Sequence, residues 1–319
     1  MITQAEKALA RVTDEAMCGM MNFLQWKRPD QVCSRAQFDA YIAACAGLSR
    51  EEFYKIPPMT NLADTPTTWR WDSPHPGPYA ESNRTRVEWY PCEQGPTAPT
   101  VILLHALMSA NDAGYFRTAR WFNARGWNAA FPHLPLHYSR TPRGFMNGEL
   151  AITADLVRTG ETLRQSVKEL RQLMAHLRAQ GCREFGLTGT SWGGWNASLL
   201  SFVEPDFRFV ALIQPIVDVE HAIWHNPTAR AMRRLLRANA IRPGESNHHN
   251  HLTSPRHGTP LCGGERMIFT AGTYDTIAPL AEIAEVAAQW KGSKLLTVRQ
   301  GHFGYAAMPA TLREIEGRL

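Results

Sequence analysis

Residues 185–193 read Phe-Gly-Leu-Thr-Gly-Thr-Ser-Trp-Gly, an apolar run that ends in the pentapeptide Gly189-Thr190-Ser191-Trp192-Gly193. A helical pattern follows over 195–203. This order predicts a strand, a sharp turn and a helix, with the Ser191 hydroxyl lifted clear of the sheet as a nucleophile. Only residues without bulk fit two positions either side of such a serine, which accounts for both glycines. The pentapeptide also arises by chance and in ordinary capped turns, so its context must decide.

Two later loops carry the residue types that a serine nucleophile needs. Asp275 follows an apolar run and precedes a proline and a helical pattern, and His302 lies between glycines after a short strand candidate. All three side chains would meet at one edge of a parallel sheet, because each follows the carboxyl end of a predicted strand. An imidazole can accept the serine proton near neutral pH, and a carboxylate can orient that imidazole. Asp218 is the alternative acid, and we favour Asp275 because a proline and a helix follow it.

The chain order serine, acid, histidine resembles that of the α/β-hydrolase superfamily, over most of the chain from about residue 86. An apolar strand also runs into His105-Ala106-Leu107, which resembles the oxyanion segment of that family, with alanine where glycine is usual. The resemblance implies that the backbone N–H groups of Leu107 and Trp192 would donate to an oxyanion. We expect three residues to contact the substrate: His105, Ala106 and Trp224.

Strand candidates alternate with helical patterns, which predicts an α/β-hydrolase fold with a mostly parallel sheet and helices on both faces. We assign residues 1–84 to an N-terminal helical segment, to about residue 56, and a proline-rich loop or linker. Residues 85–319 form the hydrolase domain, with an inserted cap at about 219–265, a stretch too long for a simple connection. The expected strands are 86–90, 101–104, 128–131, 185–187, 209–214, 267–270 and 295–298, with a long helix over 155–179.

These residues predict a serine hydrolase that cleaves a carboxylic ester of a small molecule through an acyl-enzyme, without a cofactor. The complete set of serine, acid and histidine favours this function over a non-catalytic binding protein of the same fold, with a small apolar ligand between Trp192 and the Trp224 region. Hydrolysis of amides, thioesters or carbon–carbon bonds stays open, because the fold alone does not determine the reaction.

Composition limits the other function classes. The net charge of +5 is modest and the basic residues form no stripe with interleaved aromatics, so we expect no nucleic-acid partner. No apolar stretch approaches the ~18 residues of a membrane span and no signal-peptide core is present, so a cytoplasmic location is expected, with peripheral lipid contact and the oligomeric state open. The six widely spaced cysteines are expected to be reduced.

Three further polar clusters have two interpretations each. One helical face carries Arg230, Arg233, Arg234 and Arg237. Its two interpretations are a binding surface for an anionic substrate or lipid, and a solvated face that pairs with nearby carboxylates, which we favour. The histidines His248, His249 and His251 are interpreted either as a metal site or as part of a polar loop, and we favour the polar loop. The loop after the strand candidate 128–131 carries His133, His137, Arg140 and Arg143. The sequence supports equally that these side chains line the substrate pocket and that they stabilise the fold of their own loop.

Overall fold

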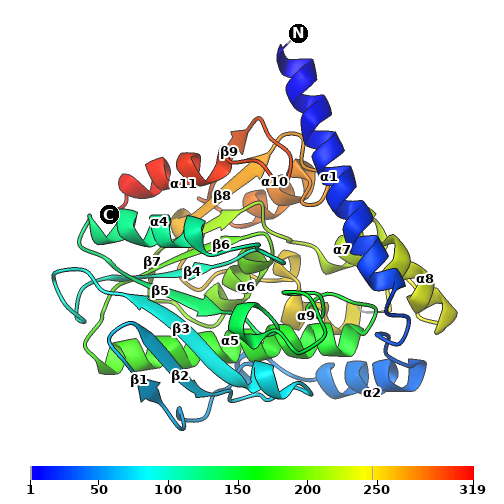
Figure 1. The fold of residues 1–319 in the computed structure, drawn as a ribbon, viewed down its shortest axis with the longest axis horizontal. Coiled ribbons are helices and arrows are strands. Elements are labelled where there is room, and N and C mark those ends of the chain that lie inside the picture. Colours follow the sequence, from blue (N-terminus) through cyan, green and yellow to red (C-terminus); the bar gives the residue numbers. More distant parts are fainter. Residues whose placement is uncertain (1, 246) are drawn as a thin grey trace.

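The computed structural model describes residues 2–245 and 247–319, which build a nine-stranded mixed sheet (Figure 1). The strand order is β1-β2-β3-β5-β4-β6-β7-β8-β9. The pairs β1–β2, β2–β3 and β3–β5 are antiparallel, and the other five pairs are parallel. The strands are β1 (Ala63–Asp64), β2 (Thr68–Asp72), β3 (Arg84–Tyr90), β4 (Thr100–Leu104), β5 (Asn128–His133), β6 (Phe185–Thr190), β7 (Phe207–Ile213), β8 (Met267–Gly272) and β9 (Lys294–Val298).

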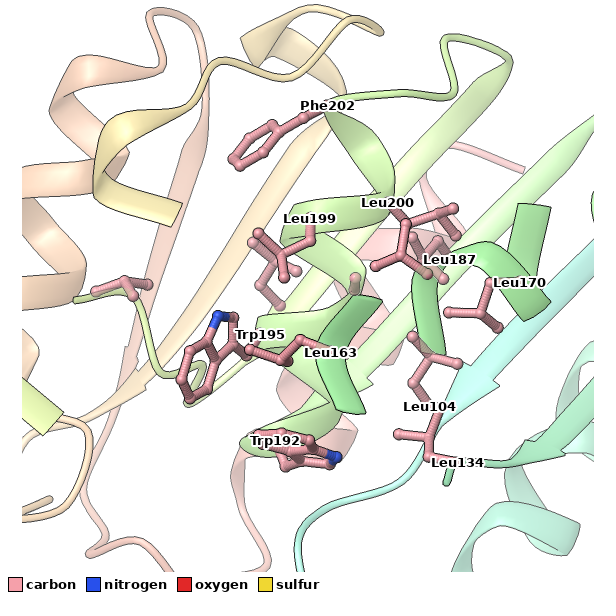
Figure 2. Close-up of a cluster of buried hydrophobic side chains, with 14 of the residues drawn as sticks. Leu104, Leu134, Leu163, Leu170, Leu187, Trp192, Trp195, Leu199, Leu200 and Phe202 are labelled. Atoms are coloured by element: carbon pink, nitrogen blue, oxygen red, sulfur yellow. The ribbon is translucent and has the colours of Figure 1, made fainter. Parts of the chain in front are cut away.

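Helices cover both faces of this sheet. The α-helices are α1 (Ile2–Trp26), α2 (Arg35–Cys45), α3 (Arg50–Phe53), α4 (Ala113–Asn123), α5 (Leu156–Ala179), α6 (Trp192–Ser201), α7 (Val219–Trp224), α8 (Arg230–Ala238), α9 (Asn247–Thr253), α10 (Leu280–Gln289) and α11 (Ala307–Glu316). Val101 and Leu103 of β4 pack toward α4 and α11 in one apolar cluster. Leu104 packs on the opposite face with α5 and α6, in the cluster that Figure 2 shows, because side chains alternate along a strand. The predicted α/β-hydrolase layering is therefore confirmed.

All seven expected strands are present at nearly the expected bounds, but the segment 57–84 is more than the loop we expected. It contains β1 and β2, and Trp69 and Trp71 of β2 are buried while the residue between them is exposed. The Trp71 indole Nε1 donates to Gln172 of α5 at 2.8 Å. The surrounding prolines concealed this period-two pattern, and the sheet begins before residue 85, where the sequence placed the domain boundary.

Helix α1 packs through a different face from the one that its apolar pattern predicts. The apolar residues Ala8, Val12, Ala16, Met20 and Phe23 recur at helical spacing and predict that this face packs on the main domain. Val12 and Phe23 are instead 63% and 49% exposed, whereas Asp14 is fully buried. Asn22 and Gln25 accept hydrogen bonds from the first-turn N–H groups of α8. These N–H groups have no partner within α8, so polar side chains are the ones that satisfy them. Apolar periodicity indicated another face because the buried face of α1 combines Cys18 with the polar side chains of Asp14 and Gln25.

The segment between β7 and β8 carries α7, α8 and α9, which lie near α1 and α2 on one side of the molecule (Figure 1). This is the region where we expected an inserted cap. None of the helices within residues 2–245 and 247–319 combines the length and apolar character that a bilayer crossing requires.

Candidate active site

Ser191 occupies a strained turn between β6 and α6. Its backbone has φ 52° and ψ −111°, a conformation that non-glycine residues adopt only at a cost of about 1–3 kcal/mol. A Cβ on Gly189 would lie 2.3 Å from the Gly193 carbonyl oxygen, and a Cβ on Gly193 would lie 2.3 Å from the Leu104 carbonyl oxygen. Both glycines are therefore required by close backbone approach, as the sequence indicated.

The structure brings Ser191, His302 and Asp275 together. His302 Nε2 lies 2.9 Å from Ser191 Oγ, and His302 Nδ1 lies 2.8 Å from Asp275 Oδ2. The side chain of His302 is only 7% exposed and that of Asp275 is fully buried. Asp218, the alternative acid, instead caps α7 and forms an ion pair with Arg256 at 2.6 Å. The arrangement can pass a proton from a hydroxyl to an imidazole that a carboxylate orients.

Backbone amides hold the Asp275 carboxylate in place. Its Oδ1 accepts from the N–H groups of Ile277 and Ala278, both at 2.8 Å, while Oδ2 faces His302. A carboxylate that accepts several N–H groups keeps one orientation, so Asp275 presents a fixed oxygen to the imidazole.

Gln214 is a site residue that our sequence analysis missed. It follows β7 with φ 47°, is buried, and donates through Nε2 to Asp275 Oδ2 and to the Gly301 carbonyl oxygen. Its Oε1 accepts from Gln300 Nε2 at 2.7 Å. A polar residue that directly follows the apolar run 209–213 was the signal that could have identified it.

Asp14 of α1 is the second residue that sequence reasoning missed. Its Oδ1 accepts from the backbone N–H of His302 at 3.0 Å. Its Oδ2 accepts from the backbone N–H and the hydroxyl of Thr276, both at 3.1 Å. Burial raises the pKa of Asp14. One acidic residue among several on an amphipathic helix gives no sequence signal for such a contact.

The charge around His302 favours its protonated form. Burial lowers the pKa of His302, but the charge of Asp275, its hydrogen bond and the charge of Asp14 together raise that pKa above the ordinary value. The imidazolium that forms when the ring accepts a proton is therefore stabilised by two carboxylates.

The residues of the expected oxyanion donors, Leu107 and Trp192, line the same cavity as Ser191. Trp192 is the first residue of α6, so its N–H has no acceptor within that helix. Within the described residues, the N–H of Leu107 donates to no other group of the chain. The N–H of Ala106 is occupied, because it donates to the Tyr115 hydroxyl at 2.9 Å. The positive φ in this segment falls on Met108, so alanine at position 106 meets no conformational obstacle.

An apolar cavity of about 160 Å³ opens beside Ser191 and His302. Its walls come from α1, α2, α5, α6 and the segment between β7 and β8, and they include Met17, Met21, Phe38, Leu163, Ile223 and Met232. Ala106 lines the cavity as expected, whereas His105 and Trp224 do not. His105 is instead fully buried and accepts the Leu134 N–H at 3.0 Å, which ties the ends of β4 and β5 together. Trp224 packs beneath Arg237.

The loop cluster after β5 serves folding. Arg140 is buried and pairs with both carboxylate oxygens of Glu169 at 2.6 and 2.7 Å. His133 contacts Ser139 at 2.9 Å, and the backbone N–H of Arg143 donates to Glu81. Neither His133 nor His137 nor Arg140 lines the cavity.

The remaining clusters show no metal site. Within the described residues, no three His, Cys, Asp or Glu side chains could hold a metal ion. Ser246 and the side chain of His248 lie outside the described residues, His249 is buried against Tyr41, and His251 contacts the Leu48 carbonyl oxygen at 2.9 Å. All six cysteines are buried and unpaired.

The basic face of α8 differs from the ion-paired face that we favoured. Arg233 donates to the carbonyl oxygens of Ile223 and Asn226. The ion pairs found within the described part of the chain include none with the four arginines of this face, Arg230, Arg233, Arg234 and Arg237.

Comparison with known sequences finds two distant relatives among curated proteins. No protein-family model matches the chain. Two uncharacterized proteins of Mycobacterium tuberculosis, from strains CDC 1551 and H37Rv, are 24% identical over 210 residues, which is 65% of this chain. The chain spans about half the length of these curated relatives, since the match covers 50% of each.

Solved structures share the fold. Acetyl xylan esterase 1 from a Thermoanaerobacterium species is 14% identical with a TM-score of 0.57, covering 89% of this chain and 93% of that one. A putative hydrolase from Agrobacterium vitis is 13% identical with a TM-score of 0.54, covering 82% and 99%. Esterase 2 of Thermogutta terrifontis is 16% identical with a TM-score of 0.51, covering 73% and 86%. At these identities the likeness establishes the fold, and the chain has the α/β-hydrolase fold that its sequence resembles.

Proposed function

We propose that this chain is a serine hydrolase that cleaves carboxylic esters through an acyl-enzyme. The observation that carries the proposal is the continuous hydrogen-bond chain from Ser191 Oγ through His302 to Asp275, at 2.9 and 2.8 Å. Ser191 is the nucleophile, His302 the general base and Asp275 the residue that orients the imidazole.

The reaction follows from these positions. Ser191 Oγ attacks the ester carbonyl carbon while His302 Nε2 takes the hydroxyl proton, and the new oxyanion accepts from the N–H groups of Leu107 and Trp192. The carbon–oxygen bond to the alcohol then breaks as His302 returns the proton to the leaving oxygen. A water molecule, deprotonated by His302, attacks the acyl-serine and releases the acid with Ser191 restored.

The cavity supports an ester with an apolar acyl group. Its lining is predominantly aliphatic, aromatic and thioether, and the candidate nucleophile lies on its wall. The esterases that share the fold add support, and one structure of Thermogutta terrifontis esterase 2 is phosphonylated by sarin, a reaction typical of an activated serine. That structure has a TM-score of 0.51 and 16% identity to this chain.

A fluorophosphonate probe tests the proposal. We expect one adduct on Ser191, located by peptide mapping, and loss of at least about 10³-fold in turnover of p-nitrophenyl acyl esters for Ser191→Ala. Ser198→Ala is the matched control, because that buried serine lies on α6 and its hydroxyl donates to the Gly194 carbonyl oxygen of the same helix. An unlabelled but folded wild-type protein would refute the proposal and favour a binding protein of the same fold. Labelling without ester turnover would direct the search to amides or thioesters.

A further inference from the structure

Helix α1 contacts the loops of the acid and the base through a buried carboxylate, that of Asp14. We propose that Asp14 is a positioning residue for the reaction: it holds the loop of His302 in register with Ser191 and Asp275. The inference rests on the proposed function, since it assigns His302 as the base. It makes the N-terminal helix part of the catalytic unit.

The contacts of Asp14 are directed at the two loops that carry the acid and the base. One oxygen accepts the backbone N–H of His302, and the other accepts the N–H and hydroxyl of Thr276, the residue after Asp275. A single carboxylate therefore fixes the spacing between the loop after β8 and the loop after β9. Hydrogen bonds to an ionised acceptor are about twice as strong as neutral ones, so this link resists displacement.

The close packing of α1 against the His302 loop supports a specific contact. A Cβ on Gly301 would lie 2.9 Å from Asp14 Oδ1 and 3.1 Å from the Ala10 Cβ. The chain thus has no side chain at the residue before His302, where any side chain would push α1 away. Asp14 does not line the apolar cavity, so its contribution is separate from substrate binding.

The charge of Asp14 also acts on the imidazole. Asp275 and Asp14 both raise the pKa of His302 against the effect of burial. The Cys18 thiol, one helical turn from Asp14, has its pKa raised by burial and by the charges of Asp14, Asp275 and Glu15, while Arg230 of α8 lowers that pKa. Within the described residues Asp14 has no ion pair, so its charge is directed at the N–H groups and the imidazole.

The test compares Asp14→Asn with Glu15→Gln, which removes the same charge from an exposed neighbour on the same helix. For Asp14→Asn we expect kcat to fall about ten- to hundred-fold with KM nearly unchanged, because a small misplacement of a catalytic group costs rate and not binding. The acid limb of the pH profile should move to lower pH, because the pKa of His302 falls when the carboxylate charge is removed. Glu15→Gln should change none of these quantities.

NMR titration of the His302 imidazole in both variants measures the same coupling without requiring turnover. An unchanged His302 titration in Asp14→Asn would overturn the proposal, as would a loss of kcat with an unmoved acid limb, which is the result of a merely structural role. Absence of ester turnover in the wild type would refute the proposed esterase, while the titration would still decide on Asp14.

A second variant covers the case in which Asp14→Asn fails to fold. Thr276→Val keeps the side-chain shape and the backbone N–H but removes the hydroxyl that donates to Asp14. The carboxylate is then less favoured in its ionised form, so kcat should fall less than in Asp14→Asn and the acid limb should move in the same direction. A Thr276→Val protein with the wild-type kcat and pH profile would overturn the proposal.

Discussion

Gln214 joins three parts of the candidate active site, and its replacement by methionine tests whether that junction holds the site together. Methionine is unbranched and similar in size, so Gln214→Met removes the amide while largely keeping the packing. The change deletes the hydrogen bonds from Gln214 to Asp275, to the Gly301 carbonyl oxygen and from Gln300.

The expected loss of stability depends on which hydrogen-bond partners each group keeps in Gln214→Met. Asp275 keeps its two backbone donors and His302, so the lost bond to its carboxylate costs only about 1–2 kcal/mol. The Gly301 carbonyl and the Gln300 amide lose a buried partner, at about 1–3 kcal/mol for each group. We therefore expect the free energy of unfolding to fall by about 3–8 kcal/mol, a large part of the ~5–15 kcal/mol of a typical domain.

Urea unfolding followed by tryptophan fluorescence measures this loss, and ester turnover on the folded protein measures the loosening of Asp275. Gln289→Met is the matched control, because Gln289 is exposed at the end of α10. An unfolding midpoint for Gln214→Met equal to that of Gln289→Met would show that the junction contributes no stability, and the reasoning would fail.

Two further predictions concern the turn that carries Ser191 and the imidazole of His302. Gly193→Ala places a Cβ 2.3 Å from the Leu104 carbonyl oxygen, so we expect a loss of about 3 kcal/mol in urea unfolding together with a lower kcat, and a wild-type midpoint would contradict the geometry. Ester turnover should fall in acid as His302 takes up a proton. Burial lowers the pKa of His302, but Asp275 and Asp14 raise it above 6.5, so the acid limb of kcat/KM should lie above that pH. An acid limb below pH 6.5 would show that burial outweighs both carboxylates.

The parts of the site that local sequence determines were predictable. Ser191 directly follows the buried strand β6 and has a glycine two positions away on each side, and Asp275 and His302 each follow a strand in a loop. A parallel sheet places the ends of such strands at one edge, so a pattern of local signals was enough to bring the three together.

The parts that depend on tertiary packing were not predictable. The buried face of α1 carries Asp14 and Gln25, whose partners lie in loops and helices far along the chain, so apolar periodicity indicated the wrong face. His105 was expected at the substrate because of its place after β4, yet its ring is committed to the Leu134 N–H. In each case a hydrogen bond to a distant backbone group, which no local pattern reveals, decided the outcome.

The bond between Asp14 and the His302 backbone joins residues 288 positions apart, which affects how the protein folds. The entropic free-energy cost of closing a loop grows slowly with loop length, by about 0.6 kcal/mol for each doubling, so the long separation adds little to the cost of this contact in the native state. Contacts of such high sequence separation nevertheless form late, after local helices and neighbouring strands. During refolding, tryptophan burial should therefore precede the return of enzymatic turnover, and the interval between them measures the docking of α1.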